Sequence, residues 1–229
     1  MISTIATCMS AALKTTSAII TLFLFILLGC GLTGFSQDSP IKSTSLFDGK
    51  SLKGWSTVEP GDMPLWKVVD STITCGDGVS KIKANTYLQT DQQFEDFEFR
   101  CLFRLYGDEK TGMINSGIQY RSNVVNKLIV GYQADIGNGY WGDLYDEHRR
   151  GKLAGGDLRI LRHLLKNDGW NSYIIRVKGN HHELYINGIK TVDYVEKDAK
   201  IPSKGVIAVQ IHSGGAGVVE FRDLTVNPL

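Results

Sequence analysis

The chain has little proline, few cysteines and no excess of charge of either sign. Its 229 residues include 5 prolines and 4 cysteines, and its formal net charge is +1. The low proline content, with 42% hydrophobic residues, argues against a disordered or collagen-like chain. The near balance of charge argues against a nucleic-acid ligand or an anionic membrane surface. The length suits one sizeable domain with a buried core.

No apolar run reaches the roughly 20 residues that a membrane-spanning helix needs. The longest run covers residues 18–28, is interrupted only by Thr21, and follows a segment whose single charge is Lys14. Residues 1–29 therefore have the pattern of a signal peptide. The four residues that end at Cys30 resemble a bacterial lipobox, so we expect lipidation at this cysteine, with plain secretion or a retained anchor as the alternatives. The protein is then periplasmic or anchored to the outer membrane, and contacts a membrane only through the lipid.

Beyond this leader, residues 30–43 form a short polar tether and residues 44–229 a folded domain. Cys75 and Cys101 are the cysteines of that domain. Their spacing matches no zinc-binding pattern, and no motif around them indicates a nucleophile. We expect two small buried hydrophobic residues, with a disulfide as the alternative.

Helical periodicity is also nearly absent. One segment, residues 157–166, combines an Asp cap with a leucine stripe and predicts a helix. Elsewhere the dominant period is two, as in residues 97–105, where apolar side chains alternate with mostly polar ones. Asn187-Gly188 predicts a hairpin turn. Many short strands and glycine-rich turns predict an all-β fold, a two-sheet antiparallel jelly-roll sandwich of the concanavalin-like type.

The alternation of side chains along three of these strands predicts where a site lies. In each strand the apolar residues share one face, and neutral or charged hydrogen-bonding groups share the other. If the strands are neighbours in one curved sheet, the second set converges on its concave side. That set contains Asn115, Gln119, Arg121, Gln133, Asp135, Gln210 and His212. The alternative is an ordinary solvated face, although such faces carry mainly Lys, Glu and Thr.

The segment 137–150 strengthens this interpretation because it mixes aromatic rings with acids and arginines between glycines. Aromatic faces pack against the C–H patches of sugars, and acids and arginines bind hydroxyls or transfer protons. The residues of interest here are Tyr140, Trp141, Asp143, Tyr145, Asp146, Glu147, His148, Arg149 and Arg150. A surface loop with ordinary ion pairs is the alternative. Trp55 and Trp66 are expected in the core, and His181 and His182 on the surface.

Several short motifs, in this order, resemble the 3-keto-disaccharide hydrolase domain. The resemblance covers about residues 44–229. It rests on Leu46-Phe-Asp-Gly-Lys-Ser-Leu-Lys-Gly-Trp55, Asn115-Ser-Gly-Ile118, Gly131-Tyr-Gln-Ala-Asp135, Leu144-Tyr-Asp-Glu147, Gly169-Trp-Asn171, Ile186-Asn-Gly188, Val209-Gln-Ile-His212 and Phe221-Arg-Asp-Leu224. Many members of the family have Glu-x-Gln where this chain has Gln133-Ala-Asp135. The resemblance implies a concanavalin-like jelly roll and cleavage of glycosides whose sugar has been oxidised to a ketone at C3.

A 3-keto-glycoside needs a base for its acidified C2 proton, a group that stabilises the enolate, and an acid for the leaving oxygen. We expect Asp135 or His212 as the base, Arg121 as the enolate partner and Glu147 as the acid. The expected substrate-binding residues are Asn115, Gln119, Gln133, Trp141, Tyr145 and Gln210. Asp135, His212 and Glu147 are alternatively a divalent-metal site. The rival function is a non-catalytic carbohydrate-binding module, and a monomer is expected in either case.

Overall fold

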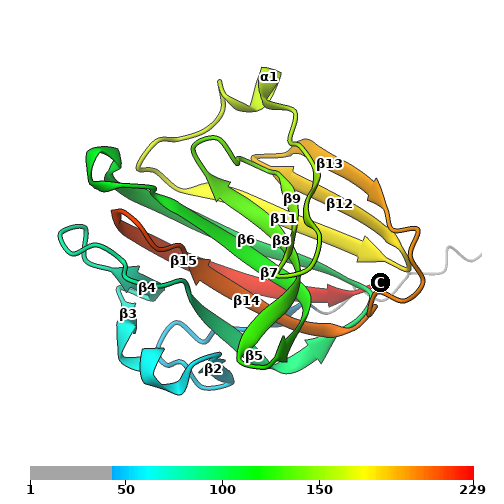
Figure 1. Cartoon of the computed structure of the whole chain (residues 1–229), viewed down its shortest axis with the longest axis horizontal. Coiled ribbons are helices and arrows are strands. Elements are labelled where there is room, and N and C mark those ends of the chain that lie inside the picture. The colour runs from blue at the N-terminus through cyan, green and yellow to red at the C-terminus, as the bar shows by residue number, and fades with distance from the viewer. Residues whose placement is uncertain (1–42) are drawn as a thin grey trace, which may run out of the picture. The chain divides into compact units, whose positions relative to one another are not determined.

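The computed structural model describes residues 43–229, which form two antiparallel sheets packed face to face (Figure 1). The first sheet contains β1 (Thr44–Ser45), β3 (Trp66–Val69), β4 (Thr72–Gly76), β6 (Phe97–Asp108), β11 (Asn171–Lys178), β12 (His181–Ile186), β13 (Ile189–Val195) and β15 (Ala216–Pro228). The second contains β2 (Trp55–Thr57), β5 (Thr86–Phe94), β7 (Asn115–Val125), β8 (Leu128–Gly137), β9 (Leu144–Glu147), β10 (Gly151–Ala154) and β14 (Gly205–Ile211). Three short helices complete the described part: η1 (Pro60–Leu65), η2 (Glu109–Thr111) and α1 (Leu158–Leu161).

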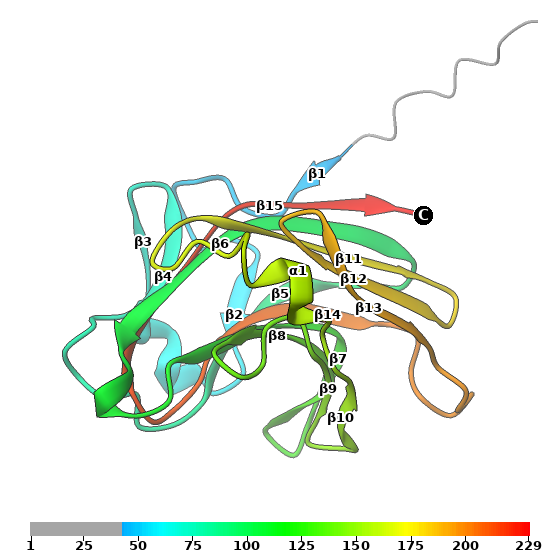
Figure 2. The same ribbon diagram turned by 90° about the horizontal axis from the view of Figure 1, so that it is seen from above.

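The strand order brings segments that are distant in sequence side by side. The first sheet runs β13-β12-β11-β6-β15-β4-β3, with β1 paired to β15, and the second runs β10-β9-β8-β7-β14-β5-β2. Figure 2 shows the two layers from above, with the β9–β10 hairpin bending away from the sandwich. The predicted all-β, two-sheet antiparallel jelly roll is confirmed. The expected leader, tether and lipidated Cys30 lie outside the described residues, apart from residue 43.

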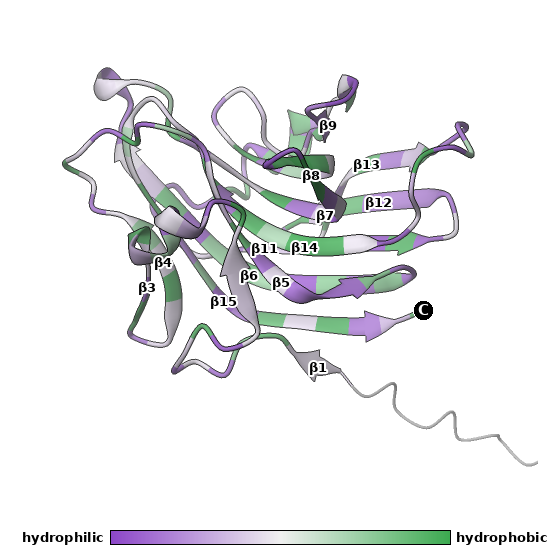
Figure 3. Ribbon diagram, turned by 60° about the horizontal axis from the view of Figure 1, so that its bottom comes forward, coloured by the Kyte–Doolittle hydropathy of each residue, from purple (hydrophilic) through white to green (hydrophobic). Residues whose placement is uncertain are grey.

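The core lies between the inner faces of the two sheets. Alternation of apolar and polar residues is visible along the strands in Figure 3. Phe97, Phe99 and Phe103 of β6 are at most 1% exposed, and they face Ile207 and Val209 of β14, which are fully buried. Trp55 and Trp66 are buried in this core, as expected. Cys75 and Cys101 are also buried and are free thiols, and burial raises the pKa of Cys75 to about 12.

Local signals explain two of the connections. Asn187 and Gly188 have φ values of +49° and +79°, so the predicted hairpin turn joins β12 to β13. The Asp157 side chain accepts a hydrogen bond from the backbone of Arg159 and caps α1, as predicted. The prediction that this helix continues to residue 166 was wrong.

Beyond α1 the backbone continues in tighter turns, in which the His163 N–H donates to Ile160 and the Leu164 N–H to Leu161, and side chains from outside the segment bind its carbonyls. The Asn187 amide donates to the Leu164 carbonyl, and the Asn171 amide donates to the Lys166 carbonyl. Leu161 at the end of α1 is fully buried, and Leu165 beyond it still packs against the core from this non-helical segment. No helix in residues 43–229 is long and apolar enough to cross a membrane.

Candidate active site

A pocket of about 240 Å³ lies on the outer face of the second sheet. Strands β7, β8 and β9 supply five of its residues, and the other three come from the segments before β7, between β8 and β9, and directly after β14. Its lining residues are Met113, Asn115, Gln133, Asp135, Tyr140, Tyr145, Glu147 and His212. We call it the site pocket. The structure brings together six of the predicted site residues here, namely Asn115, Gln133, Asp135, Tyr145, Glu147 and His212.

Asp135 is the most perturbed acid of the site pocket. Its side chain lies on β8, and the residue is 4% exposed. Burial raises the pKa of this carboxyl to about 7, and the charges of Asp143 and Glu147 act in the same direction. A hydrogen bond from the Gln133 amide, 2.6 Å to Oδ1, opposes the rise by stabilising the ionised form. Asp135 therefore exchanges its proton near neutral pH.

A chain of hydrogen bonds orients that carboxyl. The Ser122 hydroxyl donates to Gln119 Oε1 at 2.8 Å, the Gln119 amide donates to Gln133 Oε1 at 2.7 Å, and the Gln133 amide donates to Asp135. All three hydrogen bonds run in the same direction, with the donor group in each facing toward the Asp135 side. The Oδ2 atom of Asp135 has no hydrogen-bond partner within residues 43–229, so it is the oxygen that can reach a ligand.

The absence of a side chain at Gly117 leaves the space that the Gln133 side chain occupies. The two residues lie on the neighbouring strands β7 and β8, where Gly117 pairs with Asp135 and Gln133 with Gln119. A Cβ atom added to Gly117 would lie 2.6 Å from Cδ and 2.9 Å from Nε2 of Gln133. Any side chain at position 117 would therefore displace the amide that binds Asp135.

Glu147 is held from across the sheet by Tyr87, a residue that the sequence analysis did not identify. Tyr87 lies on β5, and its hydroxyl donates to Glu147 Oε1 at 2.8 Å. The Gln210 amide donates to the same hydroxyl at 3.1 Å. Burial and the Glu147 charge raise the pKa of Tyr87, so the phenol stays protonated and remains a donor.

The two histidines next to these acids have fixed tautomers. Nδ1 of His212 lies 2.7 Å from the carbonyl oxygen of Ser213, and Nδ1 of His148 lies 2.8 Å from that of Ile129. A carbonyl only accepts, so Nδ1 carries the proton in both rings. Nε2 of His212 is therefore free to accept a proton in the site pocket. Nε2 of His148 lies 3.9 Å from Glu147 Oε1.

The structure does not bring Arg121 to the site pocket, and the expectation that it faces the other site residues was wrong. Tyr120 and Arg121 together stand opposite Ile207, because the pairing of β7 with β14 skips a residue between Gln119 and Ser122. Arg121 has a φ value of +46° at this β-bulge. A bulge shifts the alternation of side chains by one residue, so the Arg121 side chain leaves the face that Gln119 occupies.

Arg121 instead ties loops together at the other end of the sandwich. The residue is 3% exposed. Its guanidinium donates to the carbonyls of Glu95 and Gly179, each at 2.7 Å, and to Asp96 Oδ1 at 2.8 Å. With all three nitrogens engaged in this way, Arg121 has a structural role.

Three other predicted residues also lie outside the lining of the site pocket. Gln119 and Gln210 are fully buried and reach it only through Gln133 and Tyr87. Trp141 packs against Phe103 at a ring distance of 6.3 Å and lines a different cavity. They support the pocket or the core. None of them lines the site pocket, where their contact with a substrate was predicted.

His182 was expected on the surface and is fully buried, so that expectation was wrong. Its ring lies between the sheets, 4.4 Å from the ring of Tyr132 and 5.7 Å from that of Tyr120. Nδ1 of His182 forms a 3.1 Å hydrogen bond with the Tyr120 hydroxyl. Burial lowers the pKa of His182 to about 3, so the ring is neutral.

The charged residues of the β9–β10 region mostly pair with one another. Asp143 binds Lys152 Nζ at 2.6 Å and the backbone of Gly156 at 2.7 Å. Asp146 is fully buried and is bound by the guanidinium groups of Arg149 and Arg150. These ion pairs hold the hairpin that carries Glu147 and Tyr145, and they leave Glu147 as the acid of this segment that faces the site pocket.

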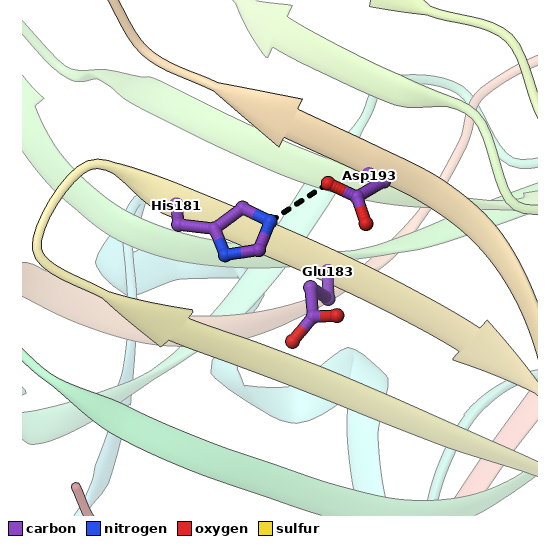
Figure 4. Close-up of side chains that lie close together, drawn as sticks. All are labelled: His181, Glu183 and Asp193. Atoms are coloured by element: carbon purple, nitrogen blue, oxygen red, sulfur yellow. Dashed lines mark hydrogen bonds and ion pairs between the residues drawn. The ribbon is translucent and has the colours of Figure 1, made fainter.

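Within residues 43–229, Asp135, Glu147 and His212 do not form a group close enough to hold one metal ion. The three potential ligands that do lie within 4.8 Å of one another are His181, Glu183 and Asp193, shown in Figure 4. They lie on β12 and β13 of the other sheet. Lys190 Nζ already binds Glu183 and Asp193, at 2.5 and 2.7 Å, so this group is an ion-pair cluster.

A family model described as the 3-keto-alpha-glucoside-1,2-lyase-like domain matches residues 42–227. No curated protein is significantly similar to the chain. A solved structure of a candidate glycosyl hydrolase from Parabacteroides distasonis is 18% identical, with a TM-score of 0.59, and the match covers 82% of this chain and 94% of that one.

Two other solved structures share the fold at lower identity. The carbohydrate-binding module CBM66 from Bacillus subtilis is 11% identical, with a TM-score of 0.57, and the match covers 76% of this chain and 95% of that one. A Bacillus subtilis protein with a galectin-like fold is 10% identical, with a TM-score of 0.58 and coverages of 82% and 95%. At these identities the three structures establish the fold alone.

Replacing Arg121 by alanine is expected to lower the free energy of unfolding by about 2–4 kcal/mol, because the buried guanidinium is lost and the Glu95 and Gly179 carbonyls and Asp96 lose their donor. Urea denaturation measures this change. Arg100→Ala, which removes a half-exposed ion pair with Glu98, is the control and should cost at most about 1 kcal/mol. A fully stable Arg121→Ala protein would contradict the structural role.

Asp135→Asn tests the raised pKa without any substrate. The folded state holds the Asp135 proton up to about pH 7, whereas an ordinary Asp releases it near 3.8. The stability that this proton contributes is complete below pH 3.8 and lost as the pH rises through 7. The asparagine variant should therefore gain stability relative to the wild type as pH rises from 4 to 8, by up to about 4 kcal/mol. Thermal unfolding across this range measures the gain, and the exposed Asp70→Asn variant should show no such trend.

Proposed function

The chain belongs to the 3-keto-alpha-glucoside-1,2-lyase-like domain family, and from this premise we propose that it cleaves glycosides whose sugar carries a ketone at C3. The observation that carries the proposal is the buried Asp135 carboxyl, with a pKa of about 7, in a pocket whose other polar groups are amides, an imidazole and a second carboxyl. We also propose that the reaction takes place outside the cytoplasm, because residues 1–30 resemble a lipoprotein signal.

The proposed reaction is an elimination. The ketone at C3 acidifies the proton on C2, and a base removes that proton. The electron pair moves onto the ketone oxygen as an enolate, and its return forms the C1–C2 double bond and breaks the bond between C1 and the leaving oxygen. The leaving oxygen takes up a proton and departs as an alcohol. Addition of water to the resulting enone completes a net hydrolysis.

Asp135 is the proposed base. A carboxylate with a pKa near 7 is a stronger base than an ordinary one and is still ionised at neutral pH. Its Oδ2 atom is available because Gln133 occupies Oδ1. His212 is the second candidate, since its Nε2 is free to accept a proton. Asp135 has the stronger support because burial has already adjusted its pKa to the task.

The remaining roles fall to Asn115 and Glu147. Because Arg121 does not line the site pocket, another group must stabilise the enolate. Asn115 is 5% exposed and lines the pocket, and its amide is the neutral donor that can take this role. Glu147 is the proposed acid for the leaving oxygen. Tyr87 donates to one of its oxygens, which leaves the other oxygen for the leaving group.

Asp135→Ala is expected to reduce kcat/KM on a 3-keto-disaccharide at least 100-fold, because it removes the base. The wild-type kcat/KM should rise with pH through an inflection near 7, since only the ionised carboxylate accepts a proton. Release of the free sugar measures both. A wild-type profile that falls through pH 7 would contradict Asp135 as the base, and full turnover by Asp135→Ala would do the same.

Glu147→Gln is expected to be selective for the leaving group. With a disaccharide, whose leaving alcohol needs a proton, kcat/KM should fall at least 100-fold. With a 3-keto nitrophenyl glycoside, whose phenolate leaves unprotonated, it should fall less than tenfold. Equal losses on both substrates would argue that Glu147 positions other groups instead of donating a proton.

The unoxidised disaccharide separates catalysis from binding alone. The proposal expects turnover only of the 3-keto substrate. Calorimetry on both sugars provides the parallel measurement. Binding of both without any product would favour the carbohydrate-binding module instead.

A further inference from the structure

A separate pocket of about 570 Å³ has more than twice the volume of the site pocket. It lies between the β3–β4 hairpin, drawn at the left of Figure 1, and the loop that leads to β5. Three lysines, Lys67, Lys81 and Lys83, line it, and we call it the lysine pocket. It shares no lining residue with the site pocket, and none of the roles proposed above uses it.

The lysines give this pocket an excess of positive charge. All three are exposed, and none of them forms an ion pair within residues 43–229. The lining also contains two acids, Asp62 and Asp77, so three positive charges face two negative ones. The excess is one positive charge, which a ligand with a single negative charge would balance.

Asp77 is already engaged in a turn of its own. Its Oδ1 atom accepts the backbone N–H groups of Ser80 and Val79 at 2.7 and 2.8 Å, and these bonds lower the pKa of the carboxyl. Asp62 is therefore the acid whose carboxylate is left to face the lysines. It would repel a ligand that carries two negative charges more strongly than a ligand that carries one.

The inner wall of the lysine pocket offers buried hydrogen-bond donors. Thr86 is 1% exposed, and its Oγ1 atom accepts the indole N–H of Trp66 at 3.2 Å. The hydroxyl proton of Thr86 has no acceptor within residues 43–229, so it can be donated to a ligand. Cys75, which is 2% exposed, adds a thiol that burial keeps protonated by raising its pKa to about 12. A buried donor without an acceptor is costly unless a group in the pocket accepts its proton.

Apolar side chains form another part of the wall. Pro64 and Leu65 of η1 line the pocket, as do Ile82 and Ala84 of the loop before β5. Leu65 is 51% exposed, so an apolar group bound against it would remove hydrophobic surface from water. The lining therefore combines hydrogen-bond donors and positive charge with an apolar surface.

We propose that the lysine pocket binds a small organic carboxylate with an apolar body, such as a fatty acid or an aromatic acid. The carboxylate balances the excess positive charge and accepts hydrogen bonds from the lysines and from the Thr86 hydroxyl. The apolar body covers Leu65 and Ile82. Inorganic phosphate has no such body and brings more negative charge toward Asp62. This binding is independent of the proposed cleavage, because the two pockets have no residue in common.

Calorimetry tests the chemical class of the ligand. Octanoate and 3-phenylpropanoate represent fatty and aromatic acids, and each is compared with the alcohol of the same skeleton and with acetate. The tighter-binding acid should bind at least about tenfold more tightly than its alcohol, which lacks the charge, and than acetate, which lacks the body. Failure of both acids to do so would overturn the inference, and so would tighter binding of inorganic phosphate.

A pair of charge reversals tests the lysines. The double variant Lys81→Glu with Lys83→Glu should weaken binding of the tighter acid at least about tenfold. Lys197→Glu with Lys200→Glu is the matched control. It makes the same change of charge at two exposed lysines between β13 and β14, outside the pocket lining, and should bind as the wild type does. Equal losses in both double variants would show attraction to the overall charge and would overturn the pocket as the site.

Thr86 tests whether the carboxylate reaches the inner wall. Thr86→Val should weaken binding at least about fivefold, whereas Thr86→Ser, which keeps the hydroxyl, should bind as the wild type does. Asp135→Ala should also retain wild-type affinity, because Asp135 lines the site pocket. Weaker binding by Asp135→Ala would move the carboxylate to the site pocket and overturn the inference, as would wild-type affinity in Thr86→Val. Thermal unfolding would show that each variant is folded.

Discussion

The hydrogen bond between Tyr87 and Glu147 depends on the curvature of the second sheet. Tyr87 lies on β5 and Glu147 on β9, and β14, β7 and β8 lie between them. Adjacent strands are about 4.8 Å apart, so four steps across a flat sheet span roughly 19 Å, more than the two side chains can bridge. The bond at 2.8 Å therefore requires a strongly curved sheet. This curvature buries Gln119, Ala208 and Gln210 on a face that a flat sheet would leave in water.

A β-bulge in β7, between Gln119 and Ser122, interrupts this buried outer face of the second sheet. Gly131 and Gly205 flank the bulged residues of β7, and a Cβ atom on either would lie within 2.4 Å of Ser122. These glycines let the neighbouring strands approach the bulge, which in turn directs Arg121 away from the site pocket. The same strand therefore supplies Asn115 to the chemistry at one end and a structural arginine at the other. Because Arg121 faces away from the site pocket, the donor bound to Asp135 is a neutral amide, that of Gln133.

Alternation of side chains along regular strands predicted much of the fold and part of the pocket. The inward residues of β6 and β14 and the hairpin at Asn187-Gly188 followed from local rules, as did the common face of Asn115, Gln133 and Asp135. The prediction for Arg121 was wrong because one extra residue in a strand reverses this alternation. The identity of single residues in the sequence does not show where such a bulge occurs. Tyr87 was missed for another reason. It alternates with buried Leu88, but its role depends on β5 pairing with β14, a contact more than 100 residues apart in sequence.

The amides that surround Asp135 adjust its chemistry as well as its orientation. Burial alone pushes the pKa of this carboxyl upward, and the negative charges of Asp143 and Glu147 add to the effect. The Gln133 hydrogen bond acts in the opposite direction, and Gln119 and Ser122 fix the orientation of that amide. Without the bond, the pKa of the carboxyl would be higher, and a smaller fraction of it would be ionised to act as a base at neutral pH. The hydrogen bond from Gln133 to Asp135 requires a glycine at position 117, because the Gln133 side chain occupies the space that a side chain there would fill.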